Sequence, residues 1–389
     1  MPGDNPSLSW IASDDDRSKV RLPGTSRAQP PTATLEMAGR VAARVGVTRV
    51  ADITRLDTIG IPTYQAIRPL SRTLAVSQGK GVTPELAKLS AIMESVETWH
   101  MEQPIAPLAV APPAELGDVL GYDVSALPRC EPSVLHDGLP LRWTAARSLV
   151  DGSATFVPID VVRLTLEQPT GWHPPAFLAS TNGLASGNTR VEAALHALYE
   201  VVERDAVTAA LEGASLGARV DPATAGSAIV DELCARIARA GVTLEARFVP
   251  SPTGLPCFLA WLACPDYPGR MFGFGCHLDV EIALSRAITE AAQTRLAYVA
   301  GARDDLRGQV EDPGARQRTE PDDPPADIRD LTPAPVDHDS LLDDLEHVVK
   351  RATAAFGYPP LVVDLARDEL GVPVVKVVAP GSRVSTEVM

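Results

Sequence analysis

Residues 179–206, ASTNGLASGNTRVEAALHALYEVVERDA, contain a helix that carries its polar side chains on one face. Thr189 and Glu192 form a capping-box pattern, so the helix is expected to begin just after Thr189. At about 100° per residue, the polar positions that follow fall within roughly 80° of one another. They are Glu192, His196, Glu200 and Glu203. Three glutamates at this spacing repel one another, so a buried cluster of them requires metal ions or strong hydrogen-bond donors.

The same pattern occurs in two further segments, which are expected to be helices that begin after Thr83 and Asp279. Alanine occupies the fourth and eighth positions after each cap, which lets another backbone or a ligand approach the polar stripe. The far sides of all three helices are mostly apolar and are expected to face the core. The polar stripes of the two further helices consist of Ser90, Glu94 and Glu97, and of Arg286, Glu290 and Gln293.

Any single stripe of this kind is ordinarily the solvent-facing side of an amphipathic helix. Three matched stripes are harder to explain in that way, and they suggest one shared site. Carboxylate oxygens are hard ligands, which suit Mg²⁺ held by a few carboxylates together with substrate phosphates. The sequence therefore predicts a magnesium site where the three helices converge.

The composition is that of a globular protein, with 45% hydrophobic and 22% charged residues in a chain of 389. A net charge of −15 argues against nonspecific binding to nucleic acid or to an anionic membrane. The five cysteines form no CxxC pair, which disfavours a disulfide framework or a structural zinc site. The N-terminal residues do not have the pattern of a signal peptide, and no stretch is apolar enough to span a membrane, so a cytoplasmic protein is expected.

Strands that enter capped helices, interspersed with hairpins, predict an α+β fold with mixed sheets. Residues 1–24 are expected to be flexible, 25–381 to form one catalytic domain, and 382–389 to form a polar tail. The charged, proline-rich residues 301–338 are expected to form a mobile loop. Strands are expected at 47–53, 63–67, 71–77, 141–150, 154–164, 244–249, 257–264, 271–277, 361–364 and 372–378, and further helices at 34–46, 226–240 and 340–356.

The loop Gly79-Lys80-Gly81, just before the first helix, invites a phosphate-binding interpretation. It is not a Walker A loop, because Leu74 stands where that motif needs a glycine. Ser186-Gly187-Asn188 and Gly275-Cys276-His277 occupy the equivalent place before the other two helices. This repetition favours a structural turn at each helix entrance and leaves contacts with a ligand open.

Three segments together resemble the YcaO superfamily: residues 77–100, 179–206 and 281–295, supported by residues 372–381. The resemblance covers most of residues 25–381. It implies a YcaO-type fold in which the three capped helices converge on ATP and Mg²⁺, without a P-loop.

The resemblance also implies roles for individual residues, although it identifies no catalytic base. The metal ligands would be Glu94, Glu97, Glu192, Glu200 and Glu203. The nucleotide contacts would be Ser90, Asn188, Arg204, Glu290, Gln293 and Arg295, together with Arg27 at a position where the family often has a basic phosphate contact.

The implied reaction is ATP-dependent O-phosphorylation of a backbone amide in a ribosomally made precursor peptide or a protein. A sulfide source then gives a thioamide, an internal Cys, Ser or Thr gives an azoline, and an amine gives an amidine. Residues 47–69 resemble YcaO proteins that form thioamides with a TfuA partner, so thioamide formation is the leading expectation. The family also implies a homodimer.

Two features depart from the family pattern. Glu97 is followed by Thr98, where the first motif usually has an arginine. The proline-rich C-terminal end of azoline-forming members is absent, which weakens the azoline expectation. Together these departures leave open a non-catalytic scaffold subunit that binds peptides.

Overall fold

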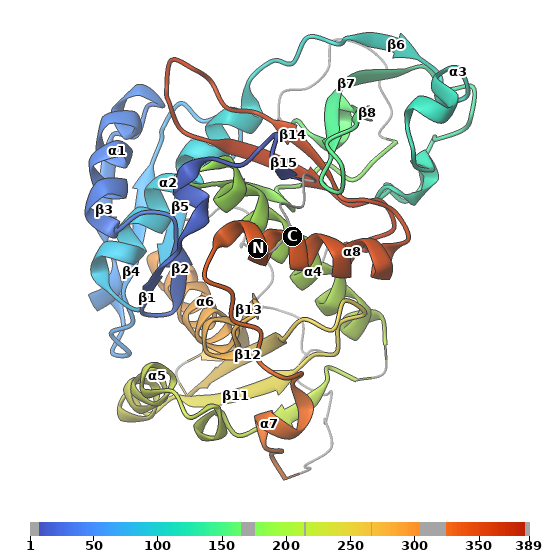
Figure 1. Ribbon diagram of the computed structural model, residues 1–389. Coiled ribbons are helices and arrows are strands. Elements are labelled where there is room, and N and C mark those ends of the chain that lie inside the picture. Colours follow the sequence, from blue (N-terminus) through green and yellow to red (C-terminus); the bar gives the residue numbers. More distant parts are fainter. Residues whose placement is uncertain (1–7, 165–175, 214, 266, 303–323, 386–389) are drawn as a thin grey trace.

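The computed structural model describes residues 8–164, 176–213, 215–265, 267–302 and 324–385. It shows helices and several sheets in an α+β arrangement, as the sequence predicts (Figure 1). The helices are α1 (Pro31–Arg44), α2 (Pro84–Glu102), α3 (Pro113–Leu116), α4 (Arg190–Glu212), α5 (Ala228–Arg239), α6 (Val280–Ala300), α7 (Ile328–Leu331) and α8 (Leu341–Phe356).

The first strands in the chain are β1 (Val20–Leu22), β2 (Thr25–Arg27), β3 (Arg49–Asp52), β4 (Thr63–Ile67), β5 (Val76–Lys80), β6 (Ala109–Ala111), β7 (Leu141–Ser148) and β8 (Ala154–Pro158). The later strands are β9 (Leu184–Ser186), β10 (Ala218–Val220), β11 (Thr243–Phe248), β12 (Cys257–Cys264), β13 (Tyr267–Cys276), β14 (Leu361–Asp364) and β15 (Val374–Val378).

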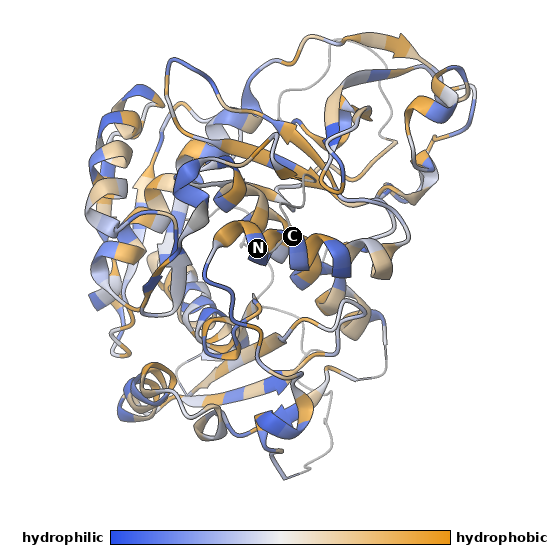
Figure 2. Cartoon of the chain, in the orientation of Figure 1, coloured by the Kyte–Doolittle hydropathy of each residue, from blue (hydrophilic) through white to orange (hydrophobic). Residues whose placement is uncertain are grey.

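These strands form four sheets. The largest has the order β6-β7-β14-β15-β9, with β8 paired to β7. A second sheet has the order β10-β11-β12-β13, a third β3-β4-β5, and β1 pairs with β2. Strands β14 and β15 are almost entirely buried and hydrophobic (Figure 2), which places them at the centre of the largest sheet's core.

The three capped helices and the strands that precede them form a closed ring. Helix α2 packs on β5 and β9, α4 packs on β9 and β13, and α6 packs on β13 and β5. Each helix therefore touches its own preceding strand and the strand of the next unit. This arrangement brings segments that are up to about 200 residues apart onto one central space.

The helices meet their strands at unusually short range, because small residues line both sides. Added Cβ atoms at Gly79, Gly187 and Gly275 would collide with the backbone of α2, α4 and α6 respectively. The alanines of the repeat lie at these contacts and are fully buried. The repeated glycine turns thus have the structural role that the sequence favours, which is close packing of backbone on backbone.

Several boundaries differ from the sequence-based expectations. Strands β4, β12 and β14 coincide with the predicted ranges. Residues 71–75 form the turn between β4 and β5 rather than a strand, because the Ser71 and Thr73 hydroxyls donate to the buried carboxylate of Glu102. The predicted loop 301–338 lies partly outside the described residues, and its described end contains α7 with a buried Ile328.

Residues 8–24, which the sequence predicts to be flexible, have defined contacts in the structure. Leu8 is buried in the core around α4, and the buried Asp16 accepts a hydrogen bond from the hydroxyl of Thr189, the N-cap residue of α4. Strand β1 also pairs with β2. A few anchoring residues hold this polar segment in place, which composition alone does not reveal. Residues 1–7 lie outside the described part of the chain.

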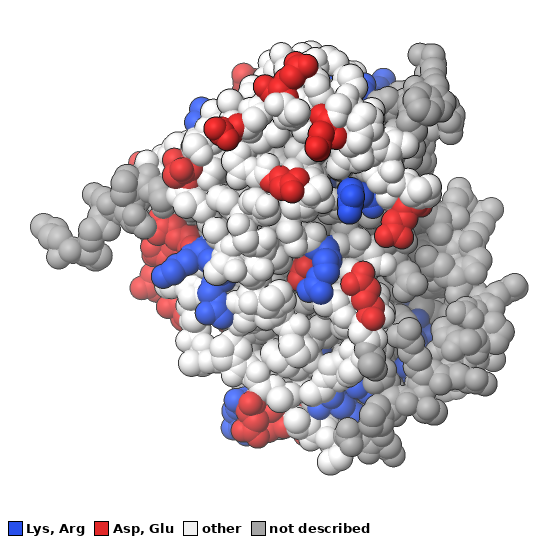
Figure 3. All heavy atoms as spheres, turned by 90° about the vertical axis from the view of Figure 1, so that its right-hand side faces the viewer, with Lys and Arg blue, Asp and Glu red and all other residues white. Residues whose placement is uncertain are grey.

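The surface carries charges of both signs. Figure 3 shows the side of the molecule that lies at the right of Figure 1, where acidic side chains prevail over the upper part and basic ones are scattered below. Within the described residues, no helix is long and apolar enough to cross a membrane.

Candidate functional site

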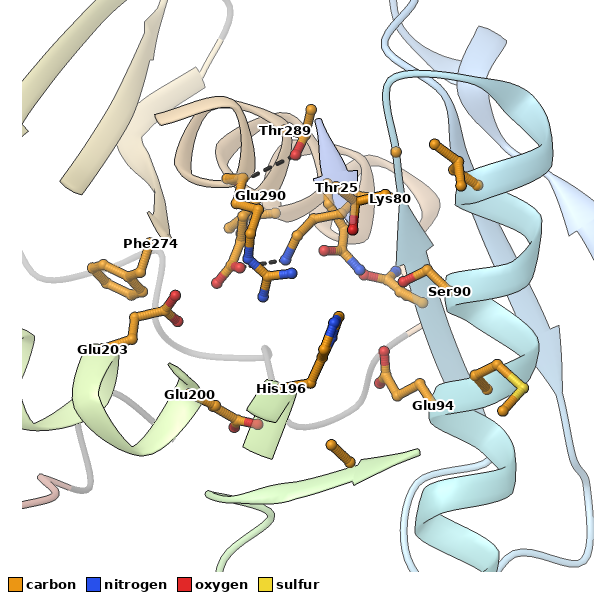
Figure 4. Close-up of a pocket in the computed structure, with 18 of the residues that line it drawn as sticks. Thr25, Lys80, Ser90, Glu94, His196, Glu200, Glu203, Phe274, Thr289 and Glu290 are labelled. Atoms are coloured by element: carbon orange, nitrogen blue, oxygen red, sulfur yellow. Dashed lines mark hydrogen bonds and ion pairs between the residues drawn. The ribbon is translucent and has the colours of Figure 1, made fainter. Parts of the chain in front are cut away.

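The ring of helices encloses a cavity of about 1380 Å³. Side chains from α2, α4 and α6 point into it (Figure 4), joined by residues of β2, β5 and β13. All but one of the residues predicted from the sequence line this cavity. They are Arg27, Ser90, Glu94, Glu97, Asn188, Glu192, Glu200, Glu203, Arg204, Glu290 and Gln293.

The orientation of each stripe follows from the helix starts. The side chains of Thr83, Thr189 and Asp279 accept hydrogen bonds from backbone N–H groups in the first turns of their helices, as expected for N-caps. The faces opposite the stripes are buried, as predicted. With its start and its buried face fixed, each helix presents its polar positions to the central cavity.

The carboxylate of Glu192, in the first turn of α4, is fully engaged by the protein. It accepts hydrogen bonds from the backbone N–H of Ala28 at 2.9 Å and from the side-chain amide of Asn188 at 3.0 and 3.2 Å. The guanidinium of Arg27 lies 3.6 Å away. The oxygen of the Asn188 amide in turn accepts from the hydroxyl of Thr34 at 2.8 Å. Glu192 therefore fixes the segment around β2 against the start of α4.

Glu97 on α2 is also engaged. One carboxylate oxygen accepts from the backbone N–H of Ser186 at 2.8 Å and from its hydroxyl at 2.5 Å. Burial raises the pKa of Glu97 to about 8, although the two bonds from Ser186 oppose that shift. As long as no metal ion is bound beside it, the Glu97 carboxyl is expected to be protonated near neutral pH.

Glu200 and Glu203, further along α4, differ from both. Neither has a hydrogen-bond or ion-pair partner among the described residues. Burial raises the pKa of each, and the nearby carboxylate of Glu290 adds to the shift of Glu203. Figure 4 shows both side chains pointing into the cavity, which leaves their oxygens available to a cation from outside the chain.

Four of the cationic side chains that line the cavity lie among these carboxylates. Lys80 forms an ion pair with Glu290 (Figure 4). Burial raises the pKa of Glu290, but Lys80, Arg204 and Arg286 together outweigh it, so this pKa lies below its usual value. Arg204 and Arg286 line the cavity with buried Nε atoms that have no hydrogen-bond partner in the described structure. Arg27 is the fourth. The cavity therefore offers positive charge suited to phosphates beside carboxylates suited to a metal.

His196 is a residue of α4, and its ring faces the side chain of Arg27. Its Nε2 atom is 2.6 Å from Nη1 of Arg27, so that nitrogen accepts a hydrogen bond and the ring is neutral. Burial and the adjacent Arg27 hold the pKa of His196 well below its usual value. A neutral imidazole adds no positive charge to this part of the cavity.

Lys80 and Arg286 line the cavity, although the sequence assigns neither of them to the site. The sequence places Lys80 in a turn and Arg286 in a polar stripe. The signal for Arg286 was present, because it occupies the same position after its cap as His196 and Ser90. Both belong with the predicted set.

Arg295 is the predicted residue that does not line the cavity. Its Nε atom lies 3.3 Å from a carboxylate oxygen of Asp57, and both side chains are buried. Asp57 follows β3 and precedes β4. This ion pair ties the end of α6 to the neighbouring three-stranded sheet and gives Arg295 a structural position.

The donor set fits Mg²⁺ bound together with a nucleotide. Among the described residues, no three His, Cys, Asp or Glu side chains converge closely enough to hold a metal ion by themselves. Mg²⁺ commonly takes only one or two carboxylates and completes its octahedron with phosphates and water. Glu200 and Glu203, which have no hydrogen-bond or ion-pair partner among the described residues, could supply such ligands, and the cations around them suit phosphates.

Comparison with known proteins gives a family. The family model described as YcaO cyclodehydratase, ATP- and Mg²⁺-binding, matches residues 78–383. An uncharacterized protein of Mycobacterium tuberculosis, MT1419, is 38% identical over 95% of this chain and 85% of its own length. An uncharacterized protein encoded in the tfuA 3′ region of Rhizobium leguminosarum bv. trifolii is 35% identical, over 97% of this chain and 93% of its own length.

Solved structures share the fold. A heterocyclase in complex with substrate and cofactor superimposes with a TM-score of 0.77 at 23% identity, covering 99% of this chain. The present chain spans only 56% of that heterocyclase. The YcaO protein of Methanopyrus kandleri, bound with AMPPCP and Mg²⁺, gives a TM-score of 0.72 at 24% identity, covering 94% of both chains.

Proposed function

The chain belongs to the YcaO family, which binds ATP and Mg²⁺, and from that premise we propose that it activates backbone amides of a peptide or protein and forms thioamides. One observation carries the proposal. Three helices from distant parts of the sequence turn matched polar faces onto one cavity, where the carboxylates of Glu200 and Glu203 have no hydrogen-bond or ion-pair partner among the described residues.

The residues divide into two groups by what they hold. Glu200 and Glu203 would bind Mg²⁺, and Glu94, Glu97 and Glu192 would complete or support the metal site. When bound, MgATP supplies the phosphoryl group that activates the amide oxygen. Contacts to the nucleotide would come from Arg27, Ser90, Asn188, Arg204, Glu290 and Gln293, joined by Lys80 and Arg286.

The chain's own residues would contribute orientation and charge. Arg204 and Arg286 approach the cavity from α4 and α6, so they would hold phosphate oxygens between two rigid helices. Lys80 would move between Glu290 and a phosphate, because its ion pair lies within the same space. Burial of the site keeps water from competing with the nucleophile.

Two observations support a thioamide as the product. The relative from Rhizobium leguminosarum is named for its position beside tfuA, and it matches nearly the whole chain. Residues 47–69 resemble the TfuA-associated subgroup. We therefore propose a TfuA-like protein as partner. Azoline and amidine formation are the alternatives, since the same activated amide leads to each.

Coexpression with candidate precursor peptides, with and without a TfuA-like protein, tests the proposal by mass spectrometry. A gain of about 16 Da means exchange of oxygen for sulfur, whereas a loss of about 18 Da means cyclodehydration. The Glu203→Gln variant is the matched control and should give no mass change. A loss of about 18 Da with the wild-type chain would replace the thioamide assignment by the azoline or amidine alternative.

The scaffold alternative is tested by calorimetry. Its main support is Thr98, which stands in place of an arginine. Arg68 reaches the Thr98 hydroxyl at 3.3 Å, but the carboxylate of Glu102 engages both of its terminal nitrogens. A catalytic YcaO protein should bind AMPPCP with heat that depends on Mg²⁺. Absence of magnesium-dependent heat would favour the scaffold.

A further inference from the structure

The cavity has a second region, which is apolar and adjoins the acidic stripes. We call it the aromatic wall and define it as Leu259, Phe272 and Phe274 with Arg270 at its far end. The cavity's volume of about 1380 Å³ exceeds the roughly 300–1000 Å³ typical of sites for small ligands. It therefore has room for more than a nucleotide.

The aromatic wall is one face of the β12–β13 hairpin. Phe274 stands opposite Leu259 in the register, and alternate residues of a strand point to the same side. The other face is occupied, because added Cβ atoms at Gly273 and Gly275 would collide with the backbone of α6. Phe272 and Phe274 consequently face the cavity, where both remain partly exposed.

The wall is long and has one charged end. Arg270, Phe272 and Phe274 alternate along β13, so the wall extends about 13 Å at roughly 3.3 Å per residue. That length matches about four residues of extended peptide and exceeds a single nucleotide base. The guanidinium of Arg270 lies over the ring of Trp261 at 4.7 Å, which positions a donor at the end of the wall.

The wall begins where the acidic cluster ends. Figure 4 shows the ring of Phe274 beside the carboxylate of Glu203, and both line the cavity. An extended chain lying on the wall would therefore bring a backbone carbonyl next to the carboxylates that would hold Mg²⁺. No such apolar surface is needed for phosphates, which bind through charge and hydrogen bonds.

We propose that the aromatic wall binds the substrate peptide in an extended conformation, and that the residues flanking the modified amide carry apolar or aromatic side chains. This inference rests on the proposed function, because it assumes that a peptide amide is the group activated beside Glu203. It adds the class of peptide sequence that the site accepts.

Two fluorescein-labelled decapeptide pools of equal length and net charge test the inference. One pool carries Leu, Phe and Tyr at alternate positions, and the other carries Ser, Thr and Gln there. Fluorescence anisotropy is measured with AMPPCP and Mg²⁺ present. The wild-type chain should bind the apolar pool about tenfold more tightly, which corresponds to burial of one large apolar side chain.

The double variant Phe272→Ala/Phe274→Ala should bring the two pools within about twofold of each other. Phe156→Ala is the matched control, because Phe156 is a partly buried aromatic residue of β8 in a different hydrophobic cluster. It should keep the tenfold preference. If the double variant melts early, Phe274→Leu keeps the wall apolar and should weaken the apolar pool alone by about two- to threefold.

Calorimetry with AMPPCP and Mg²⁺ distinguishes a failure of the peptide-binding inference from a failure of the proposed function. The wall variants should bind the nucleotide as the wild-type chain does. If they lose nucleotide affinity but keep the peptide preference, the wall holds the base and the inference is overturned. Equal binding of both pools, or binding of neither, by a wild-type chain that does bind the nucleotide also overturns it. A wild-type chain without magnesium-dependent nucleotide binding would instead overturn the proposed function.

Discussion

Helix α4 carries glutamates in two different states. The glutamate of its first turn is hydrogen-bonded within the protein, whereas those of its third and fourth turns are not. Glu192 receives hydrogen bonds from Ala28 and Asn188 and lies near Arg27. Glu200 and Glu203 have no partner among the described residues. One helix therefore carries a carboxylate that the protein uses for itself and two that it leaves available. We infer that Glu192 stabilises the fold, whereas Glu200 and Glu203 are available to bind a ligand.

The same distinction applies to the arginines of α6. Arg295 pairs with the buried carboxylate of Asp57 and lies outside the cavity, whereas Arg286 lines the cavity. Both are close in sequence, but only Arg286 belongs to the polar stripe of the helix. Their surroundings, rather than their residue type, indicate which of them would meet a phosphate.

Glu203→Gln should have the largest effect. The substitution keeps the size of the side chain but removes the charge that would bind Mg²⁺, so ATP turnover should fall by at least about 100-fold. The melting temperature should stay within a few degrees, because no described residue donates a hydrogen bond to Glu203 or forms an ion pair with it. A phosphate-release assay and thermal melting measure the two quantities.

Glu232→Gln is the control for this substitution, because Glu232 lies on α5, pairs with Arg236 and is exposed. It should leave turnover and melting unchanged. Wild-type turnover in the Glu203→Gln variant would show that the carboxylates without partners are not the metal ligands, and the contrast within α4 would lose its functional meaning.

Substitution of the two arginines of α6 should have opposite effects, one on nucleotide binding and the other on stability. Arg286→Ala should raise the KM for ATP by about tenfold or more and leave stability nearly unchanged. Arg295→Ala should leave the KM unchanged and lower the free energy of unfolding by about 3 kcal/mol, because it strands the buried Asp57. Steady-state kinetics and urea denaturation measure these effects. A raised KM in Arg295→Ala would restore the role that the sequence implied for it.

Glu192→Gln should affect stability more than chemistry. The neutral amide still accepts from Ala28 and Asn188, but it loses the charge that strengthens those bonds, so we expect a loss of about 1–2 kcal/mol in the free energy of unfolding. Urea denaturation measures this loss. A variant of unchanged stability with no ATP turnover would place Glu192 among the metal ligands instead of the supporting residues.

Periodicity and capping predicted much of the site. The caps at Thr83, Thr189 and Asp279, the three polar stripes and their buried opposite faces follow from spacing alone. The same arithmetic excludes Arg295, which stands five residues after Glu290 and therefore about 140° away around the helix. The resemblance to a family motif, and not the geometry, suggested its place in the site.

Other features depend on contacts between distant segments and could not be predicted. The partner of Glu192 is the backbone of Ala28, 164 residues away, and Ser186 engages Glu97 across 89 residues. The ring in which each helix packs on the strand of the next unit is likewise a property of the assembled fold. Spacing indicates which face a side chain lies on, but not which side chains find partners there.

The smallest expected effect is on the pH dependence of stability in the nucleotide-free protein. Burial raises the pKa of Glu97 from about 4.5 to about 8. Between these values the folded chain holds a proton that the unfolded chain has released, so stability falls as the pH rises through this range. The melting temperature should therefore drop by a few degrees between pH 5 and pH 8, and Glu97→Gln should flatten part of the drop.

Mg²⁺ with AMPPCP should also reduce the drop, because a bound cation favours the ionised carboxylates of the cavity and offsets their burial. The exposed Glu232→Gln variant is the control and should keep the wild-type slope. A Glu97→Gln variant whose melting temperature varies with pH as the wild type's does would mean that Glu97 is already ionised in the empty cavity. The hydrogen bonds from Ser186 would then outweigh burial, and Glu97 would be grouped with Glu192 as a carboxylate that the protein satisfies by itself.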